Sequence, residues 1–143
     1  MTDPTPTESN LSGLDRKDFQ KNINSRKTDL YILKNAQGME VAVTNYGCAI
    51  LSIMVPDKNG KFANVILGHD SIEHVINSPE PFLSTTIGRY GNRIANGKFT
   101  LYGEEHQLTV NNGPNSLHGG PTGFHARVWD AVQPNESTVI FNY

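Results

Sequence analysis

The amino-acid sequence predicts an all-β protein, folded as an antiparallel β-sandwich. Short runs of apolar or alternating residues follow one another along the chain, and turn-forming residues separate them. Helical character is confined to residues 14–19 and 71–76, where Ser71 caps the second segment and Pro79 prevents its continuation. Successive strands with short connections and almost no helix indicate antiparallel sheets packed face to face.

The expected strands can be placed in chain order. Residues 29–33 and 39–44 flank a turn at 35–38, which predicts a first hairpin. Further strands are expected at residues 48–55, 62–67, 98–102, 106–110, 127–132 and 138–141. The strands at 98–102 and 106–110 form a second hairpin, which turns at Gly103-Glu104.

The length of the chain suits one domain with a substantial core. It has 143 residues, of which 36% are hydrophobic. Residues 1–13 are polar and rich in Thr, Ser and Pro, so we expect a disordered N-terminal tail followed by one folded domain over residues 14–143. Cys48 is the only cysteine, which excludes an intrachain disulfide, and its apolar surroundings predict a buried thiol.

Charge and hydropathy exclude several classes of partner. The formal net charge of −2 gives no basis for binding nucleic acid or an anionic membrane surface. No apolar stretch approaches the length of a membrane span, and the N-terminal residues lack the basic start and apolar stretch of a secretory signal. Together with the single cysteine, these observations predict a cytoplasmic protein.

Two polar, glycine-rich segments contain the candidate functional residues. They read GRYGNR at residues 88–93 and NNGPNSLHGG at residues 111–120. Because the hairpin between them returns the chain toward its starting point, we expect Arg93 and His118 to lie at one site. Arginine offers a rigid fork of donors, asparagine both donates and accepts, and histidine exchanges a proton near neutral pH.

A neutral, hydroxyl-rich ligand such as a sugar suits this set of side chains better than a phosphate does. Neither GxxxxGK[ST] nor GxGxxG stands before a helix, so nucleotide binding is not supported. The other histidines lack the spacing of metal ligands, and no metal site is expected. Judged locally, Arg93 also fits a surface cation, Asn92 a turn residue, and His118 a loop residue that bonds its own backbone.

Longer stretches around these segments are similar to one enzyme family. IGRYGNRIANGKF followed by NNGPNSLHGG closely resembles the aldose 1-epimerases, also called galactose mutarotases. The similarity extends to NYGCAILSIMVPDKNGKFANVILG upstream and GFHARVWDA downstream, and so covers the chain from about residue 14 onward. The resemblance implies an antiparallel β-sandwich of the galactose mutarotase type, present here as a truncated, N-terminal portion.

The resemblance also implies a reaction and a division of roles. Family members interconvert the α and β anomers of free hexoses such as galactose and glucose, without metal or cofactor. A glutamate removes the anomeric proton while a histidine protonates the ring oxygen. Asn92, Arg93 and His118 match family residues that contact the sugar, and His118 is an auxiliary catalytic candidate. The principal catalytic histidine and glutamate of the family fall in the portion that this sequence lacks.

We therefore expect part of an epimerase, which holds the sugar, does not catalyse alone, and associates with a missing C-terminal half. Two other interpretations stay open. One is a non-catalytic carbohydrate-binding module or an interaction protein that depends on a partner chain. The other, which ranks lower, is a relative that acts on hexose 6-phosphates; this would need further cations beside the site, and Arg89 is the single nearby candidate.

Overall fold

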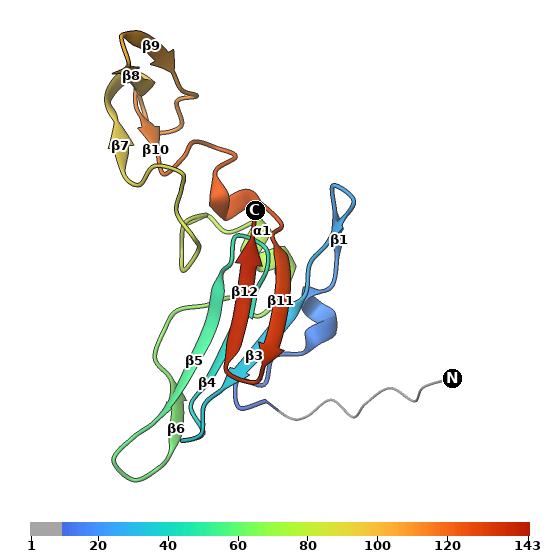
Figure 1. Ribbon diagram of the computed structural model, residues 1–143. Coiled ribbons are helices and arrows are strands. Elements are labelled where there is room, and N and C mark those ends of the chain that lie inside the picture. The colour runs from blue at the N-terminus through green and yellow to red at the C-terminus, as the bar shows by residue number, and fades with distance from the viewer. Residues whose placement is uncertain (1–9) are drawn as a thin grey trace.

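A four-stranded antiparallel sheet forms the body of the protein in the computed structural model, which describes residues 10–143 (Figure 1). Its strands lie in chain order and comprise β3 (Leu30–Lys34), β4 (Glu40–Thr44), β5 (Ile50–Pro56) and β6 (Phe62–Asn64). The first hairpin pairs Leu30 with Thr44 and Lys34 with Glu40. Antiparallel strands make up most of the regular secondary structure, so the predicted all-β class is confirmed.

The hydrophobic core lies between this sheet and two short helical segments. The segments are the 3₁₀-helix η1 (Arg16–Phe19) and the helix α1 (Ile72–Ile76), which contact each other. The buried core residues are Phe19, Leu30, Ala42, Ala49, Leu51, Ile72 and Val75. Phe19 is completely buried, and burying such a side chain contributes about 1.5–3 kcal/mol. Asp15 and Ser71 cap the two segments, as the sequence predicts for Ser71.

A hairpin near the C-terminal end of the chain comprises β11 (Asp130–Asn135) and β12 (Thr138–Asn142). It packs beside β3 (Figure 1). The Gln133 side chain donates to the carbonyl of Ile32 at 2.8 Å, and the rings of Tyr31 and Phe141 lie 5.9 Å apart. Within the described residues, β12 pairs in its sheet with β11 alone. The two layers together give the antiparallel architecture that the sequence predicts.

The buried Asn45 joins the start of β11 to the body. Its side-chain oxygen accepts from the Asp29 amide at 2.8 Å, and its side-chain nitrogen donates to the carbonyls of Lys27 and Trp129 at 3.1 and 2.9 Å. The Trp129 amide in turn donates to the Asn45 carbonyl at 2.9 Å. One amide side chain therefore satisfies backbone groups from segments about a hundred residues apart in sequence.

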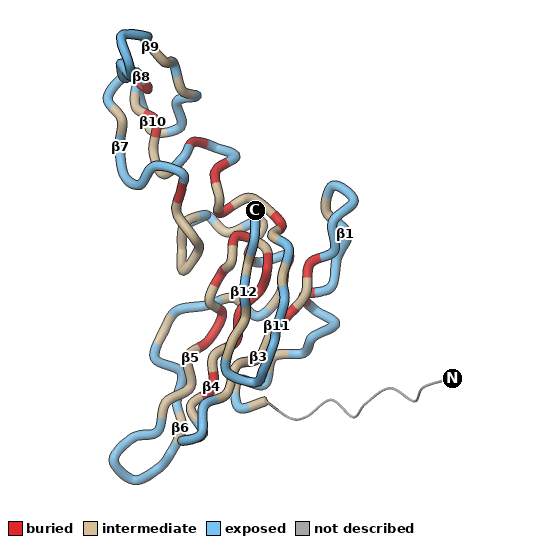
Figure 2. The backbone as a smooth tube through the Cα atoms, viewed as in Figure 1, coloured by how far each residue is buried: buried red, intermediate tan, exposed pale blue. Residues whose placement is uncertain are grey.

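A lobe between residues 93 and 117 extends from the body and is mostly exposed (Figures 1 and 2). It contains β7 (Arg93–Ile94), the 3₁₀-turn η2 (Ala95–Gly97), β8 (Lys98–Leu101), β9 (Glu104–Gln107) and β10 (Ser116–Leu117). The chain then passes through the 3₁₀-turn η3 (Phe124–Ala126) into β11. The lobe is built around the predicted β8–β9 hairpin.

Several boundaries differ from the predictions for local reasons. The β8–β9 turn lies at Tyr102-Gly103 instead of Gly103-Glu104, because both residues adopt positive φ, 51° and 85°, as a type I′ turn requires. Strand β6 ends at Asn64, whose side chain accepts from the amides of Ile53 and Ile66 at 3.0 and 3.3 Å, so the Ile53 amide bonds to a side chain instead of to strand backbone. The hairpin of β1 (Asn22–Ile23) and β2 (Arg26–Lys27) was not predicted, since two-residue strands show no periodicity.

The predicted N-terminal tail overlaps a segment that is bound to the sheet. Residues 1–9 lie outside the described residues, but the amides of Leu11 and Ser12 donate to the two carboxylate oxygens of Glu40 at 2.9 and 3.1 Å. Glu40 is fully buried in β4, where Lys34 is its nearest cation at 3.8 Å. Buried carboxyl oxygens need hydrogen-bond donors, so residues 10–13 belong with the folded body.

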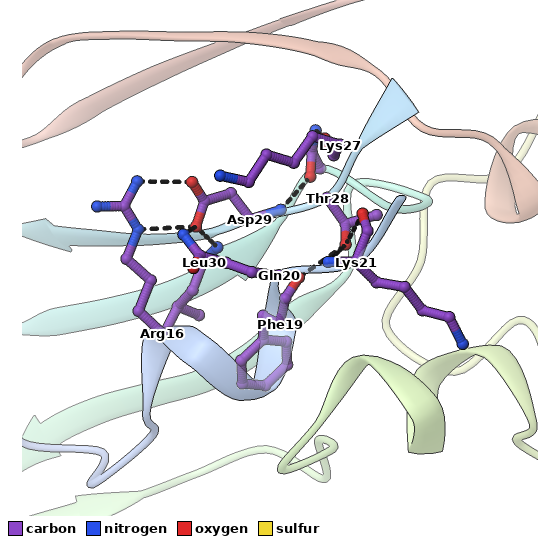
Figure 3. Close-up of polar contacts among 9 residues, drawn as sticks. Arg16, Phe19, Gln20, Lys21, Lys27, Thr28, Asp29 and Leu30 are labelled. Atoms are coloured by element: carbon purple, nitrogen blue, oxygen red, sulfur yellow. Dashed lines mark hydrogen bonds and ion pairs between the residues drawn. The ribbon is translucent and has the colours of Figure 1, made fainter. Parts of the chain in front are cut away.

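Polar contacts also attach η1 to the start of β3 (Figure 3). Arg16 forms a bidentate pair with Asp29 at 2.7 and 2.6 Å, and the Thr28 hydroxyl donates to the Phe19 carbonyl at 2.7 Å. Burial of Asp29 opposes its ionisation, but hydrogen bonds from Arg16 and the Leu30 amide outweigh that effect and lower its pKa below the ordinary value of 3.8. The ionised carboxylate thus stabilises this junction.

We predict that Glu40→Gln destabilises the protein by about 1–3 kcal/mol, because one of the two amides at residues 11 and 12 would face an NH₂ group instead of an acceptor. Urea denaturation at pH 7 measures the loss. Glu104→Gln, which makes the same change at an exposed position of β9, serves as the control and should leave the free energy of unfolding nearly unchanged.

The second prediction concerns pH. Since the folded pKa of Asp29 lies below the unfolded value, its stabilisation is present above pH 3.8 and disappears as the pH falls through the folded pKa. Asp29→Asn should therefore cost about 1–2 kcal/mol at pH 7 and much less at pH values well below 3.8. Urea denaturation at both pH values tests this, with the exposed Asp18→Asn as control. An equal loss at both would contradict the assignment.

Candidate functional site

The two glycine-rich polar segments lie side by side, as the hairpin between them predicts. Strands β7 and β10 pair antiparallel, with Arg93 opposite Leu117 and Ile94 opposite Ser116. Nearer the body the backbones approach so closely that a Cβ on Gly119 would lie 1.9 Å from the Gly88 carbonyl oxygen. Gly119 also has φ +87°, so no other residue fits there without displacing the backbone.

Asn92 and His118 hold each other through reciprocal hydrogen bonds. The Asn92 amide donates to Nδ1 of His118 at 2.9 Å, and the His118 amide donates to the Asn92 carbonyl at 3.1 Å. Both residues adopt positive φ, 64° and 54°. Because Nδ1 accepts a hydrogen bond, neutral His118 carries its proton on Nε2. The Nε2–H group is then a donor for a ligand oxygen.

Arg93 lies beside Asn92 and completes a cluster of three residues: Asn92, Arg93 and His118. Its Nε donates to the Asn112 side chain at 2.8 Å, and Nη1 makes a weaker contact of 3.5 Å with the Asn92 side-chain oxygen. The other N–H groups of the guanidinium have no protein partner among residues 10–143. The structure therefore brings Asn92, Arg93 and His118 together and leaves donors of two of them open.

Other asparagines of the second segment serve the local fold. The Asn111 side chain accepts from the Leu117 amide at 2.7 Å and donates to the Leu117 carbonyl at 3.0 Å. The Asn115 side chain accepts from the Asn96 amide at 3.2 Å. These bonds stabilise the loop before β10 and leave the two asparagines outside the cluster of Asn92, Arg93 and His118.

A cleft of about 850 Å³ opens between the lobe and the body. Its walls combine apolar side chains, including Phe99, Phe124 and Tyr143, with Arg89, Arg93 and Arg127, and no Asp or Glu side chain lines it. Arg89 lies over the Phe124 ring at 5.2 Å and Arg127 over the Tyr143 ring at 6.0 Å. Arg93 belongs to both the cluster and the cleft, whereas Asn92 and His118 do not line the cleft.

Sequence reasoning missed two aromatic residues beside His118. The Phe82 ring lies 4.8 Å from the His118 ring and 4.6 Å from the His125 ring. His125 is buried, and its Nδ1 has no hydrogen-bond partner among the described residues. Burial lowers the pKa of His125, and the charges of His118 and Arg127 act in the same direction. No sequence signal predicted this stack, because Phe82 lies in a different part of the chain from His118 and His125.

The remaining reactive side chains do not join the site. Glu105 pairs with Lys98 at 2.8 Å on the lobe, and Asp130 faces Arg26 at 3.7 Å. Burial raises the pKa of Cys48 to about 12, although a hydrogen bond with Thr86 opposes the effect, so the thiol stays protonated at neutral pH. Among residues 10–143, no group of three His, Cys, Asp or Glu side chains is arranged to hold a metal ion.

None of the helices in the described part of the chain has the length and apolar character needed to cross a membrane.

Comparison with known proteins identifies the family. The family model for aldose 1-epimerase matches residues 29–143. Galactose mutarotase from Bos taurus is 43% identical over 91 residues, which cover 64% of this chain and 26% of that protein. Aldose 1-epimerase from Escherichia coli K12 is 40% identical over 112 residues, which cover 78% of this chain and 32% of that protein.

Solved structures agree. A GalM/aldose epimerase homologue from C. elegans superimposes with a TM-score of 0.75 at 33% identity, over 80% of this chain and 35% of that one. Galactose 1-epimerase from Lactobacillus acidophilus superimposes with a TM-score of 0.68 at 32% identity, over 82% of this chain and 33% of that one. The chain thus spans between 26% and 35% of the length of these relatives. On the match of the family model and of both structures, the chain belongs to the aldose 1-epimerase family.

Proposed function

We propose that this chain binds a free hexose, such as galactose or glucose, as the sugar-contact part of an aldose 1-epimerase. The observation that carries the proposal is the hydrogen-bonded cluster of Asn92, Arg93 and His118, which leaves donors unpaired. The open N–H groups of Arg93 suit two neighbouring ring hydroxyls, and the Nε2–H of His118 suits a third oxygen. The names of the relatives, galactose mutarotase and aldose 1-epimerase, support the same class of ligand.

We further propose that the isolated chain does not catalyse the interconversion of anomers. The reaction needs a base for the anomeric hydroxyl proton and an acid for the ring oxygen, placed on either side of the breaking bond. His118 is a candidate auxiliary acid, but no carboxylate of the described residues contacts the cluster. The base, and the principal acid, would come from a part of the family fold outside these 143 residues.

Binding is tested by titrating galactose into the chain and following amide shifts of Asn92 and His118 by NMR. His118→Ala and Arg93→Ala should each weaken binding by about tenfold, because a hydrogen bond to a ligand contributes about 1.4 kcal/mol. Lys58→Ala, in the exposed turn before β6, is the control and should bind as the unmodified chain does. Unchanged affinity in both site variants would contradict the assignment.

Catalysis is tested by polarimetry on freshly dissolved α-D-galactose or α-D-glucose. The isolated chain should not raise the rate of mutarotation above the buffer rate. A clear acceleration that disappears in His118→Ala would show that the base lies within this chain, and would overturn the proposal of inactivity.

A second candidate function is that of a fragment that depends on a partner chain. Three observations favour it: the chain spans a small share of its relatives, β12 pairs only with β11 among the described strands, and Tyr143 is 56% exposed at the cleft. The partner would be the remaining part of the family fold. Isothermal titration with galactose distinguishes independent sugar binding from dependence on a partner chain. Heat with galactose alone supports an independent binding module. No heat at millimolar sugar favours the dependent fragment.

A further inference from the structure

Three aromatic rings connect the body to the sugar-contact cluster. His125 lies in η3, Phe82 in the loop before β7, and His118 directly after β10. The Phe82 ring lies between the two imidazoles, with centroid distances of 4.6 Å to His125 and 4.8 Å to His118. Both contacts are edge-to-face, with interplanar angles of 62° and 61°. The stack is therefore continuous from a buried residue to a site residue.

The first ring of the stack is fixed to the body. His125 is only 6% exposed. The Gly47 amide donates to the neighbouring Arg127 carbonyl at 2.7 Å, and a Cβ on Gly47 would lie 2.3 Å from the His125 carbonyl oxygen. The loop between β4 and β5 thus presses directly against the backbone of η3. These contacts fix the backbone of His125 against the loop between β4 and β5.

The imidazole of His125 offers packing instead of a hydrogen bond at Nδ1. That atom is buried and has no partner among the described residues. Burial lowers the pKa of His125, with His118 and Arg127 contributing, so the ring stays neutral at physiological pH. A neutral, flat ring beside Phe82 fills space and resists compression, as other close-packed side chains do.

His118, the last ring of the stack, needs a packing contact to fix its orientation. One hydrogen bond from the Asn92 amide locates Nδ1 of His118, but it leaves the imidazole plane free to tilt about that atom. Contact with Phe82 restricts the tilt and so fixes the direction in which Nε2–H points. The donor can meet a ligand oxygen only within a narrow range of directions.

We propose that His125 is a positioning residue for His118 and that it acts through the Phe82 ring. The inference rests on the proposed function, in which Nε2 of His118 contacts the sugar. His125 itself touches neither the cluster nor the ligand. The stack thus connects the body to His118, which lies at the base of an exposed lobe, and it restricts the orientation of the His118 ring.

The test compares variants by NMR and by galactose binding. His125→Ala removes the first ring and should speed exchange of the Asn92 amide by about tenfold, shift the side-chain ¹⁵N signals of His118, and weaken galactose binding by about five- to tenfold. His125→Phe restores a flat ring and should recover most of all three properties. Val75→Ala, in the buried core at α1, is the matched control: it lowers stability but should change neither signal.

The proposal is overturned if His125→Ala and Val75→Ala affect Asn92 and His118 alike, or if His125→Phe behaves as His125→Ala does. Should His125→Ala fail to fold, Phe82→Leu breaks the same stack with His125 in place and should give the same loss at His118; an unchanged His118 would equally overturn it. If the unmodified chain binds no galactose, the proposed function fails, while the amide exchange and ¹⁵N signals still decide the positioning role.

Discussion

The close approach of two backbone segments at Gly88 is the constraint on which the site depends. The Gly88 carbonyl accepts from the Phe124 amide at 3.1 Å, and Gly119 packs against the same carbonyl with no room for a side chain. A Cβ on Gly88 would in turn lie 2.3 Å from the Phe124 ring. This junction brings the chain back from the lobe to the body, and it sets Asn92 and Arg93 opposite the strand that leads to His118.

The body and the lobe are held together by different interactions. The body has an apolar core between the sheet and two helical segments, and it buries Phe19 and Leu51 almost completely. All four residues of β8 are exposed, and the lobe relies instead on side-chain amides such as those of Gln107 and Asn111. Regions with few buried apolar contacts open locally at lower free energy than a core does. The cluster of Asn92, Arg93 and His118 lies where the lobe meets the body (Figure 1).

The sequence predicts the fold well where periodicity is strong. Two strand-like runs, at β3 and β4, flank a clear turn, and this hairpin is confirmed. The β8–β9 hairpin is also confirmed, but its turn is displaced because Tyr102 adopts a positive φ that no local rule assigns to a tyrosine. Strands of two residues, such as β7 and β10, depend on tertiary contacts and leave no pattern in the sequence.

Part of the site could also be predicted, because that part depends on local structure. Asn92, Arg93 and His118 share two motifs joined by a recognisable hairpin, so their meeting follows from local structure; their role toward a sugar stays a prediction. Phe82 meets His118 and His125 only through tertiary packing, because it lies more than 30 residues before them in the chain. Likewise, Arg127, which follows η3, lines the cleft together with Arg89 and Arg93. The sequence indicates Arg89 as the single candidate for another cation near Arg93.

Trp129 gives the protein a natural optical probe of the junction. It is the only tryptophan, its indole N–H donates to the Phe124 carbonyl at 3.3 Å, and its ring lies 5.0 Å from Phe124 and 5.2 Å from Tyr143, which both line the cleft. Indole emission depends on the polarity and rigidity of its surroundings. Filling of the cleft against Phe124 and Tyr143 should therefore change the fluorescence of this one residue, without any added label.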